Sequence, residues 1–172
     1  TRGMGAFGIQ TAAISVGGIT PPGTRQSTGF AYNGSTWSAS DAINTARNAM
    51  GAGGATDAAG LIFGGDAPGA SALTEAYDGS AWTEVADLSG VRVTQGGGGT
   101  STDAFVAGGA PAPPSANYKN TTEFFSGGSS IAGEGQVWYN TTSTVLKGFG
   151  LTLGTGAWAS GTVINTARMN AG

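Results

Sequence analysis

The sequence predicts an all-β protein built from three repeats of about 45 residues, each holding four short strands. The first observation is composition, because 33 glycines and a hydrophobic content of 39% accompany only 10% charged residues. A disordered chain of this polarity normally carries more charge and fewer aromatic residues. The second is spacing, since Arg2, Arg47 and Arg92 stand 45 positions apart. Repeats of this length are typical of sheet units that stack on one another.

Further positions recur in the same phase. Each unit has a Gly-Gly doublet after its second apolar run, and three tryptophans each precede an arginine by ten residues. These structural repeat positions are Gly17, Gly18, Gly64, Gly65, Gly108 and Gly109, with Trp37, Trp82 and Trp158 and with Arg47, Arg92 and Arg168. The doublet is expected to leave room for a neighbouring backbone or aromatic ring.

The first unit supplies the strand pattern. The expected strands are Met4–Gly8, Ala12–Val16, Gly29–Tyr32 and Trp37–Ser40. Tyr-Asn-Gly at 32–34 and Tyr-Asp-Gly at 77–79 predict hairpins with type I′ turns, which need positive φ at both central residues.

Three segments follow from this phase. Residues 1–46 form the first repeat, 47–91 the second, and 92–172 the third together with the start of a next one. The third repeat is longer by 31 residues, because Arg92 and Arg168 stand 76 positions apart instead of 45. The additional residues, at about 128–157, are expected to form an inserted β-hairpin.

An apolar strand, a Gly-Gly doublet, and then Tyr and Trp a few residues apart resemble the kelch motif. This resemblance implies that each repeat is one four-stranded blade of a β-propeller. Two departures concern blade geometry: Tyr and Trp are only five residues apart, and Phe125 replaces Tyr in the third unit.

Two shorter motifs resemble bacteriophage proteins. Gly-Gln-Val-Trp-Tyr-Asn at 135–140 is similar to a hairpin module of tail-fibre and other virion proteins. Asn-Thr-Ala-Arg at 44–47 and 165–168, within glycine-rich kelch-like repeats, resembles proteins of marine and cyanobacterial phages. These resemblances imply a virion or extracellular location.

Several function classes lose their usual residues. The chain has neither His nor Cys, so disulfides, most transition-metal sites and histidine acid–base chemistry are excluded, and we expect no cofactor and no metal. The seven basic residues are scattered, which argues against nucleic acid, and no apolar run is long enough for membrane insertion. Acidic pairs close in sequence, such as Glu75 with Asp78, give no indication of converging across a cleft. We therefore expect no enzymatic activity.

The repeated tryptophans and arginines admit two interpretations. Trp37, Trp82 and Trp158 could stack on sugars, but their fixed place favours packing inside blades. Arg47, Arg92 and Arg168 could bind anionic glycans, but structural bonds to carbonyls and carboxylates between blades are favoured. The candidate binding residues are instead those in loops that interrupt the repeat: Tyr118 and Lys119, and Trp138, Tyr139 and Asn140 of the insert. The alternative for the insert is packing on its own blade or on a neighbouring subunit.

The leading hypothesis is a non-catalytic virion protein (a tail fibre, head fibre or decoration protein) that self-assembles and contacts host surface glycans. A secreted bacterial lectin-like propeller module and a carbohydrate-active enzyme are the alternatives. Expected partners are further copies of the chain or other virion proteins. Three blades do not close a ring. Three arrangements are therefore left open: two copies form a six-bladed ring, the chain is a segment of a longer repeat array, or the blades stack in a fibre.

Overall fold

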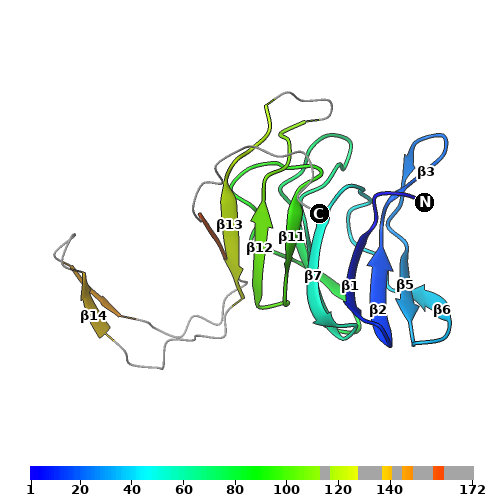
Figure 1. Ribbon diagram of the computed structural model, residues 1–172, viewed down its shortest axis with the longest axis horizontal. Coiled ribbons are helices and arrows are strands. Elements are labelled where there is room, and N and C mark those ends of the chain that lie inside the picture. The colour runs from blue at the N-terminus through cyan, green and yellow to red at the C-terminus, as the bar shows by residue number, and fades with distance from the viewer. Residues whose placement is uncertain (113–116, 128–136, 141–144, 149–156, 161–172) are drawn as a thin grey trace.

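The computed structural model describes residues 1–112, 117–127, 137–140, 145–148 and 157–160, and within them every regular element is a β-strand (Figure 1). The strands form antiparallel pairs throughout. The predicted all-β class is confirmed. In this described part there is no helix that could cross a membrane.

Three four-stranded sheets make up the body of the molecule. In each one the chain runs up and down through neighbouring strands, so that the strand order follows the sequence. The first sheet contains β1 (Gly5–Ile9), β2 (Ala12–Val16), β5 (Gly29–Tyr32) and β6 (Trp37–Ser40). The second contains β7 (Gly51–Thr56), β8 (Ala59–Phe63), β9 (Thr74–Tyr77) and β10 (Trp82–Val85). The third contains β11 (Gly96–Gly99), β12 (Asp103–Ala107), β13 (Thr122–Ser126) and β16 (Ala157–Ser160).

Two small hairpins interrupt this pattern. β3 (Ile19–Thr20) pairs with β4 (Thr24–Arg25) between β2 and β5, and sequence analysis did not anticipate it. β14 (Val137–Asn140) pairs with β15 (Val145–Gly148) between β13 and β16, inside the predicted insert. The predicted hairpin in the insert is therefore confirmed, and Figure 1 shows it well apart from the three sheets.

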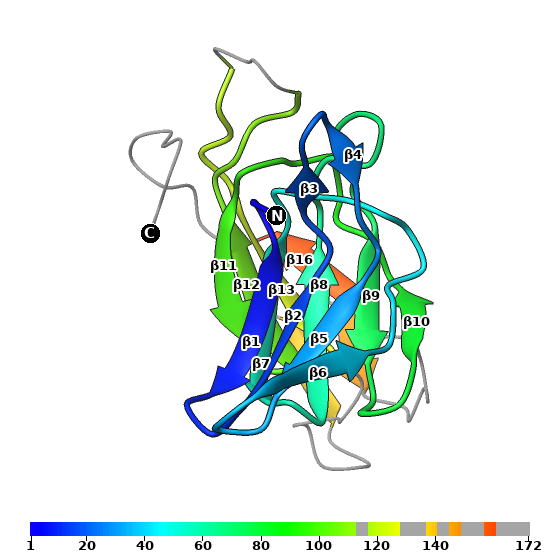
Figure 2. The same ribbon diagram turned by 90° about the vertical axis from the view of Figure 1, so that its right-hand side faces the viewer.

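The first strands of the three sheets lie next to one another. β1 packs beside β7, and β7 packs beside β11 (Figures 1 and 2). Glycines allow the close approach, because a Cβ on Gly53 would come within 3.1 Å of the Gly98 carbonyl carbon. The other strands of each sheet follow outward from this shared centre, so the sheets stack face to face.

A series of backbone hydrogen bonds links the sheets near these first strands. Gly3, Ala49 and Thr94 all have a left-handed φ, of 66°, 54° and 55°. The Ala49 N–H donates to the Gly3 carbonyl over 2.8 Å, and the Thr94 N–H donates to the Ala49 carbonyl over 3.0 Å. Each sheet therefore donates to the one before it, which gives the stack a direction.

The hairpin turns differ from the type I′ prediction. Tyr32 pairs with Trp37, so four residues form the loop, and of these only Gly34 has a left-handed φ, at 92°. The Asn33 side-chain oxygen accepts the N–H groups of Ser35 and Thr36 at 3.0 and 2.9 Å. Asp78 does the same in the second sheet, with bonds of 2.9 Å from the Ser80 and Ala81 N–H groups. In both hairpins an Asn or Asp side chain therefore closes a four-residue loop. The prediction of a two-residue type I′ turn is wrong.

Two hydrophobic cores fill the spaces between the sheets. Between the first and second sheets, the Phe7 ring lies against Tyr77 and Trp82, with centroid distances of 6.5 and 6.1 Å. Between the second and third, Phe63 is fully buried with Leu61 and Val106. Each aromatic ring rests on strand glycines, since a Cβ on Gly60 would meet Phe7 and one on Gly97 would meet Phe63. Between the sheets, aromatic rings therefore pack directly on the glycine backbone of the neighbouring sheet.

The second core gives a direct stability prediction. Replacing Phe63 with Ala should lower the free energy of unfolding by about 3–5 kcal/mol, because a cavity opens between two sheets that cannot fully collapse. Ile9→Ala, at a strand end that is 54% exposed, should cost less than about 1 kcal/mol. Urea denaturation followed by tryptophan fluorescence measures both, and equal costs would contradict the packing described.

Candidate interaction surfaces

Arg47 is a fully buried residue that joins the first two sheets. Its Nη1 donates to Glu75 Oε1 over 2.5 Å, and Glu75 Oε2 accepts the backbone N–H of Asn44 over 2.7 Å. Its carbonyl accepts the N–H of Gly18 from the first sheet over 2.9 Å. Burial lowers the pKa of Arg47, and the adjacent Glu75 carboxylate acts against that shift. The guanidinium is held inside the protein and is not offered to a ligand.

Arg92 repeats this arrangement in the third sheet. Its Nη2 donates to Glu123 Oε1, and the backbone N–H of Ser89 donates to Glu123 Oε2 over 2.8 Å. Its Nη1 donates to the carbonyls of Gly108 and Thr121, both at 3.0 Å. Each arginine thus meets a glutamate on the third strand of its sheet, and the residue three positions before the arginine donates to the same carboxylate.

The two glutamates were not singled out as arginine partners from the sequence, although a signal was present. Glu75 stands two residues before Tyr77, and Glu123 stands two residues before Phe125, the position equivalent to Tyr77. In the first sheet the matching residue is Phe30, which pairs with Ser15 as Glu75 pairs with Ile62. Phe30 is exposed.

Arg2 differs from the later arginines, although the 45-residue spacing suggested one phase for all three. It forms an isolated bridge with Ile19, directly after the first Gly-Gly doublet, while Asn48 bridges Asp66 and Val93 bridges Ala110 after the later doublets. Structurally, Arg2 therefore matches Asn48 and Val93, one residue beyond the arginine position. Arg168 lies outside the described residues.

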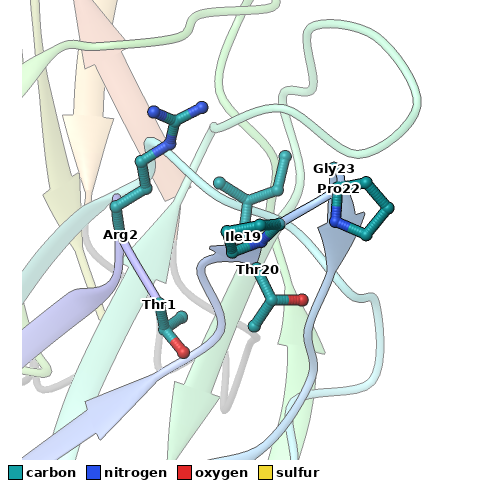
Figure 3. Close-up of a pocket in the computed structure, with 7 residues that line it drawn as sticks. Thr1, Arg2, Ile19, Thr20, Pro22 and Gly23 are labelled. Carbon is teal, nitrogen blue, oxygen red and sulfur yellow. The ribbon is translucent and has the colours of Figure 1, made fainter.

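Arg2 borders an open hollow of about 390 Å³ (Figure 3). Its lining comes from the start of the chain and from the β3–β4 hairpin: Thr1, Arg2, Ile19, Thr20, Pro21, Pro22 and Gly23. Figure 3 shows the Arg2 guanidinium extending away from Thr1 and Thr20. The polar groups therefore do not converge on one point in this hollow.

The Gly-Gly doublets leave space for the backbone of the segment that contains the next arginine. All three have left-handed φ at both glycines, for example 69° at Gly17 and 95° at Gly18. A Cβ on Gly17 would lie 2.6 Å from the Arg47 carbonyl oxygen, and one on Gly64 would lie 2.9 Å from that of Arg92. The doublet at Gly108 and Gly109 has the same conformation. These positions admit backbone from the next sheet.

The equivalent tryptophans have different surroundings. Trp82 is buried and stacks on Tyr77 with a centroid distance of 4.9 Å. Trp37 makes a similar contact with Tyr32 at 5.1 Å, yet 55% of it is exposed. The expectation that Trp37 is core is wrong for this chain, because no described residue of another sheet packs on that side of the first sheet. Trp158 pairs with Phe125 in the strand register, and its side chain lies outside the description.

The outer side of the third sheet also carries exposed aromatic residues. Phe105 and Phe124 face each other across β12 and β13 and are 43% and 49% exposed. They border a hollow of about 290 Å³ that also includes Asp103 and Ser126. This apolar surface was not predicted, because the sequence does not show which side of a sheet lacks a neighbour.

The predicted binding residues fall into two separate groups. Tyr118 and Lys119 lie in the connection from β12 to β13, where the Lys119 N–H donates to the Gly109 carbonyl over 2.8 Å. Partial burial and the nearby Arg92 lower the pKa of Lys119. Trp138, Tyr139 and Asn140 lie on β14, and their side chains are outside the described part. Figure 1 shows the β14–β15 hairpin apart from the β12–β13 connection, so the structure does not bring the two groups together.

The acidic residues that could suggest catalysis have structural partners. Glu75 and Glu123 bind arginines, and Asp78 closes a turn. Hydrogen bonds from the Ser80 and Ala81 backbone lower the pKa of Asp78. Among the described residues, no three acidic side chains gather into a cluster that could hold a metal ion.

Comparison with known proteins gives information on the fold alone. No family model and no curated protein match the chain. Among solved structures, 129 chains match. One of them, described as the structure of YjhT, has a TM-score of 0.61 and 13% sequence identity. The match covers 73% of this chain and 43% of that one, so the chain spans less than half the length of this structural neighbour.

The Arg47–Glu75 pair predicts a large and specific stability effect. Arg47→Met should destabilise the protein by about 3–5 kcal/mol, because it leaves the Glu75 carboxylate buried without its charge partner. Adding Glu75→Gln should recover part of this loss, since a neutral side-chain oxygen can still accept the Asn44 N–H. Urea denaturation measures both variants.

The partly buried pair of Arg25 with Asp66 is the matched control. Its side chains keep 28% and 14% of their accessible surface. Arg25→Met should cost clearly less than Arg47→Met, because water still reaches both side chains and solvates the Asp66 carboxylate once its partner is removed. A loss as large as that of Arg47→Met would show that burial does not determine the effect.

Glu123 predicts a pH dependence. Burial acts to raise its pKa, but the Ser89 N–H and the Arg92 guanidinium hold the pKa below its ordinary value. The resulting stability is present above the unfolded pKa of about 4.3 and is lost as pH falls through the lower folded pKa. The free energy of unfolding should fall between about pH 5 and about pH 3, and less steeply in Glu123→Gln. Equal slopes in the two proteins would contradict the assignment.

Proposed function

We propose that this chain is a non-catalytic structural protein of a phage virion, built from kelch-like β-propeller blades. The observation that supports the propeller part of the proposal is the triple repetition of one sheet around adjacent first strands. A propeller blade is a four-stranded antiparallel meander whose first strand lies nearest the axis. The three sheets match this description, and their first strands β1, β7 and β11 lie side by side.

A scaffold role agrees with how the polar residues are used. The most deeply buried charged groups are Arg47, Arg92, Glu75 and Glu123, and they pair with one another within the core. A glycosidase would need two carboxylates facing a common cleft, one with a raised pKa. Glu123 instead has a lowered pKa and an arginine partner. These acidic groups stabilise the stack.

The virion assignment rests on the phage-like motifs, namely Asn-Thr-Ala-Arg at 44–47 and the Trp-Tyr-Asn hairpin. Contact with host surface glycans is assigned to the connection with Tyr118 and Lys119 and to the β14–β15 hairpin. A lectin-like module would be expected to repeat its pocket on each blade. Here the hollow beside Arg2 is lined by the β3–β4 hairpin, and among the described strands neither the second nor the third sheet has such a hairpin between its second and third strands.

Particle composition tests the virion assignment. An antibody raised against the chain should label purified phage particles in immunogold electron microscopy, and peptides of the chain should appear in the mass spectrum of the same particles. Recovery of the protein only from particle-free culture medium would overturn the assignment and favour a secreted module.

Glycan binding is tested separately. Purified bacterial surface polysaccharide should bind the full chain, and the double variant Trp138→Ala, Tyr139→Ala should bind about tenfold more weakly or worse, because stacking aromatics are lost. Ile9→Ser removes an exposed apolar residue elsewhere and is the control. Unchanged binding by the double variant would remove the hairpin from the glycan contact.

A further inference from the structure

Each sheet in the stack has two different faces, which the strand register defines. The forward face points toward the following sheet, and the back face toward the preceding one. Ile14 and Ala31 are paired on the forward face of the first sheet, and Leu61 and Ala76 on that of the second. Ile14 and Leu61 are buried in the two inter-sheet cores.

The third sheet exposes its forward face. Phe105 is equivalent to Ile14 and Leu61, because each of the three pairs with the third residue of the first strand in its own sheet. Phe124, which pairs with Phe105, is equivalent to Ala31 and Ala76. Both phenylalanines are exposed. We call them the forward end face.

The first sheet exposes its back face. Tyr77 and Trp82 lie on the back face of the second sheet and are buried against Phe7. Their counterparts in the first sheet are Tyr32 and Trp37, which keep the same mutual contact and lie partly or largely open to solvent. With the exposed Phe30, they form the back end face.

The backbone series has matching open ends. Successive sheets are joined by donation from Ala49 to Gly3 and from Thr94 to Ala49. Among the described residues, neither the Gly3 N–H nor the Thr94 carbonyl has a partner. A donor therefore remains beside the back end face and an acceptor beside the forward end face, which is the combination needed to continue the series.

We propose that two copies of this chain pair through these faces, with the forward end face of each covering the back end face of the other. The contact repeats the one inside the chain, where a forward-face aromatic residue, Phe7, packs on a back-face Tyr–Trp pair. Two such contacts related by a two-fold axis would close a ring of six sheets, within the four to eight blades usual for propellers. The inference rests on the proposed propeller arrangement and not on the virion location.

The size of the structural neighbour agrees with a second copy. The match covers 43% of the chain described as YjhT, so more than half of that chain lies outside the matched part. Two copies supply a comparable length of sheet. They also cover both aromatic end faces, which would otherwise expose adjoining apolar surface.

Sedimentation equilibrium and native mass spectrometry of the full 172-residue chain test the pairing. The expected species has twice the 16.8 kDa mass of one chain. Phe124→Asp and Trp37→Asp should each weaken dimerisation by at least about tenfold, because a carboxylate would be buried in an aromatic contact. Ile9→Asp, which lies on neither end face, should leave the dimer intact. Circular dichroism verifies that each variant is folded.

Cross-linking tests the orientation without charged substitutions. The natural chain has no cysteine, so Trp37→Cys and Phe124→Cys each introduce a single thiol. A short bis-maleimide should join the two variants when they are mixed and should not join either variant to itself. Self-joined Trp37→Cys chains would overturn the forward-to-back orientation.

The remaining outcomes also decide the proposal. A ladder of open oligomers would overturn the closed ring. A single 16.8 kDa species would overturn pairing between copies and would assign the end faces to sheets supplied by another polypeptide. That monomer would leave particle labelling unaffected, so failure of the pairing is distinguishable from failure of the virion assignment.

Discussion

The buried arginine at the junction between sheets is the interaction on which the stack depends. Arg47 accepts a hydrogen bond from the Gly18 N–H of the first sheet through its carbonyl and binds Glu75 of the second sheet through its guanidinium. Arg92 likewise accepts from Gly65 and binds Glu123. Because an unpaired buried charge is strongly unfavourable, each arginine allows only one placement of the linking segment against the third strand of its sheet. The first glycine of the doublet is required by the same geometry, since a side chain on Gly17 or Gly64 would collide with the carbonyl oxygen of Arg47 or Arg92.

This linkage also explains why the stack has a direction. Each arginine segment reaches back to the doublet of the preceding sheet and forward into its own, and the Gly3, Ala49 and Thr94 hydrogen bonds run the same way. A sheet therefore has a face that receives an aromatic ring and a face that supplies one. The two ends of such a stack differ from each other, which favours a contact between unlike ends over a contact between two like ends.

Much of the fold could be predicted from the sequence, because local patterns determine it. Three of the four strands expected in the first unit have the observed bounds, and the first, Gly5–Ile9, begins one residue later than expected. The hairpin in the insert was also predicted correctly. The turn type was wrong because an Asn or Asp side chain closes the loop in place of a second left-handed residue. The one-residue offset of Arg2 could not be seen from spacing alone, since only the backbone bridges show that it matches Asn48.

Burial was harder to predict than strand position, because it depends on neighbours that a repeat does not specify. Trp37 and Trp82 occupy the same position and differ only in whether a sheet lies opposite. The insert shows that strand register, in contrast, does not depend on the length of the connecting loop. β13 and β16 pair with the same alignment of Phe125 and Trp158 that Tyr77 and Trp82 show in the second sheet, although the chain between them contains the β14–β15 hairpin. Loop closure entropy grows only slowly with length, so an outer-strand connection can lengthen at little cost while the core keeps its register. The register of β13 with β16 therefore does not depend on the length of the connection between them.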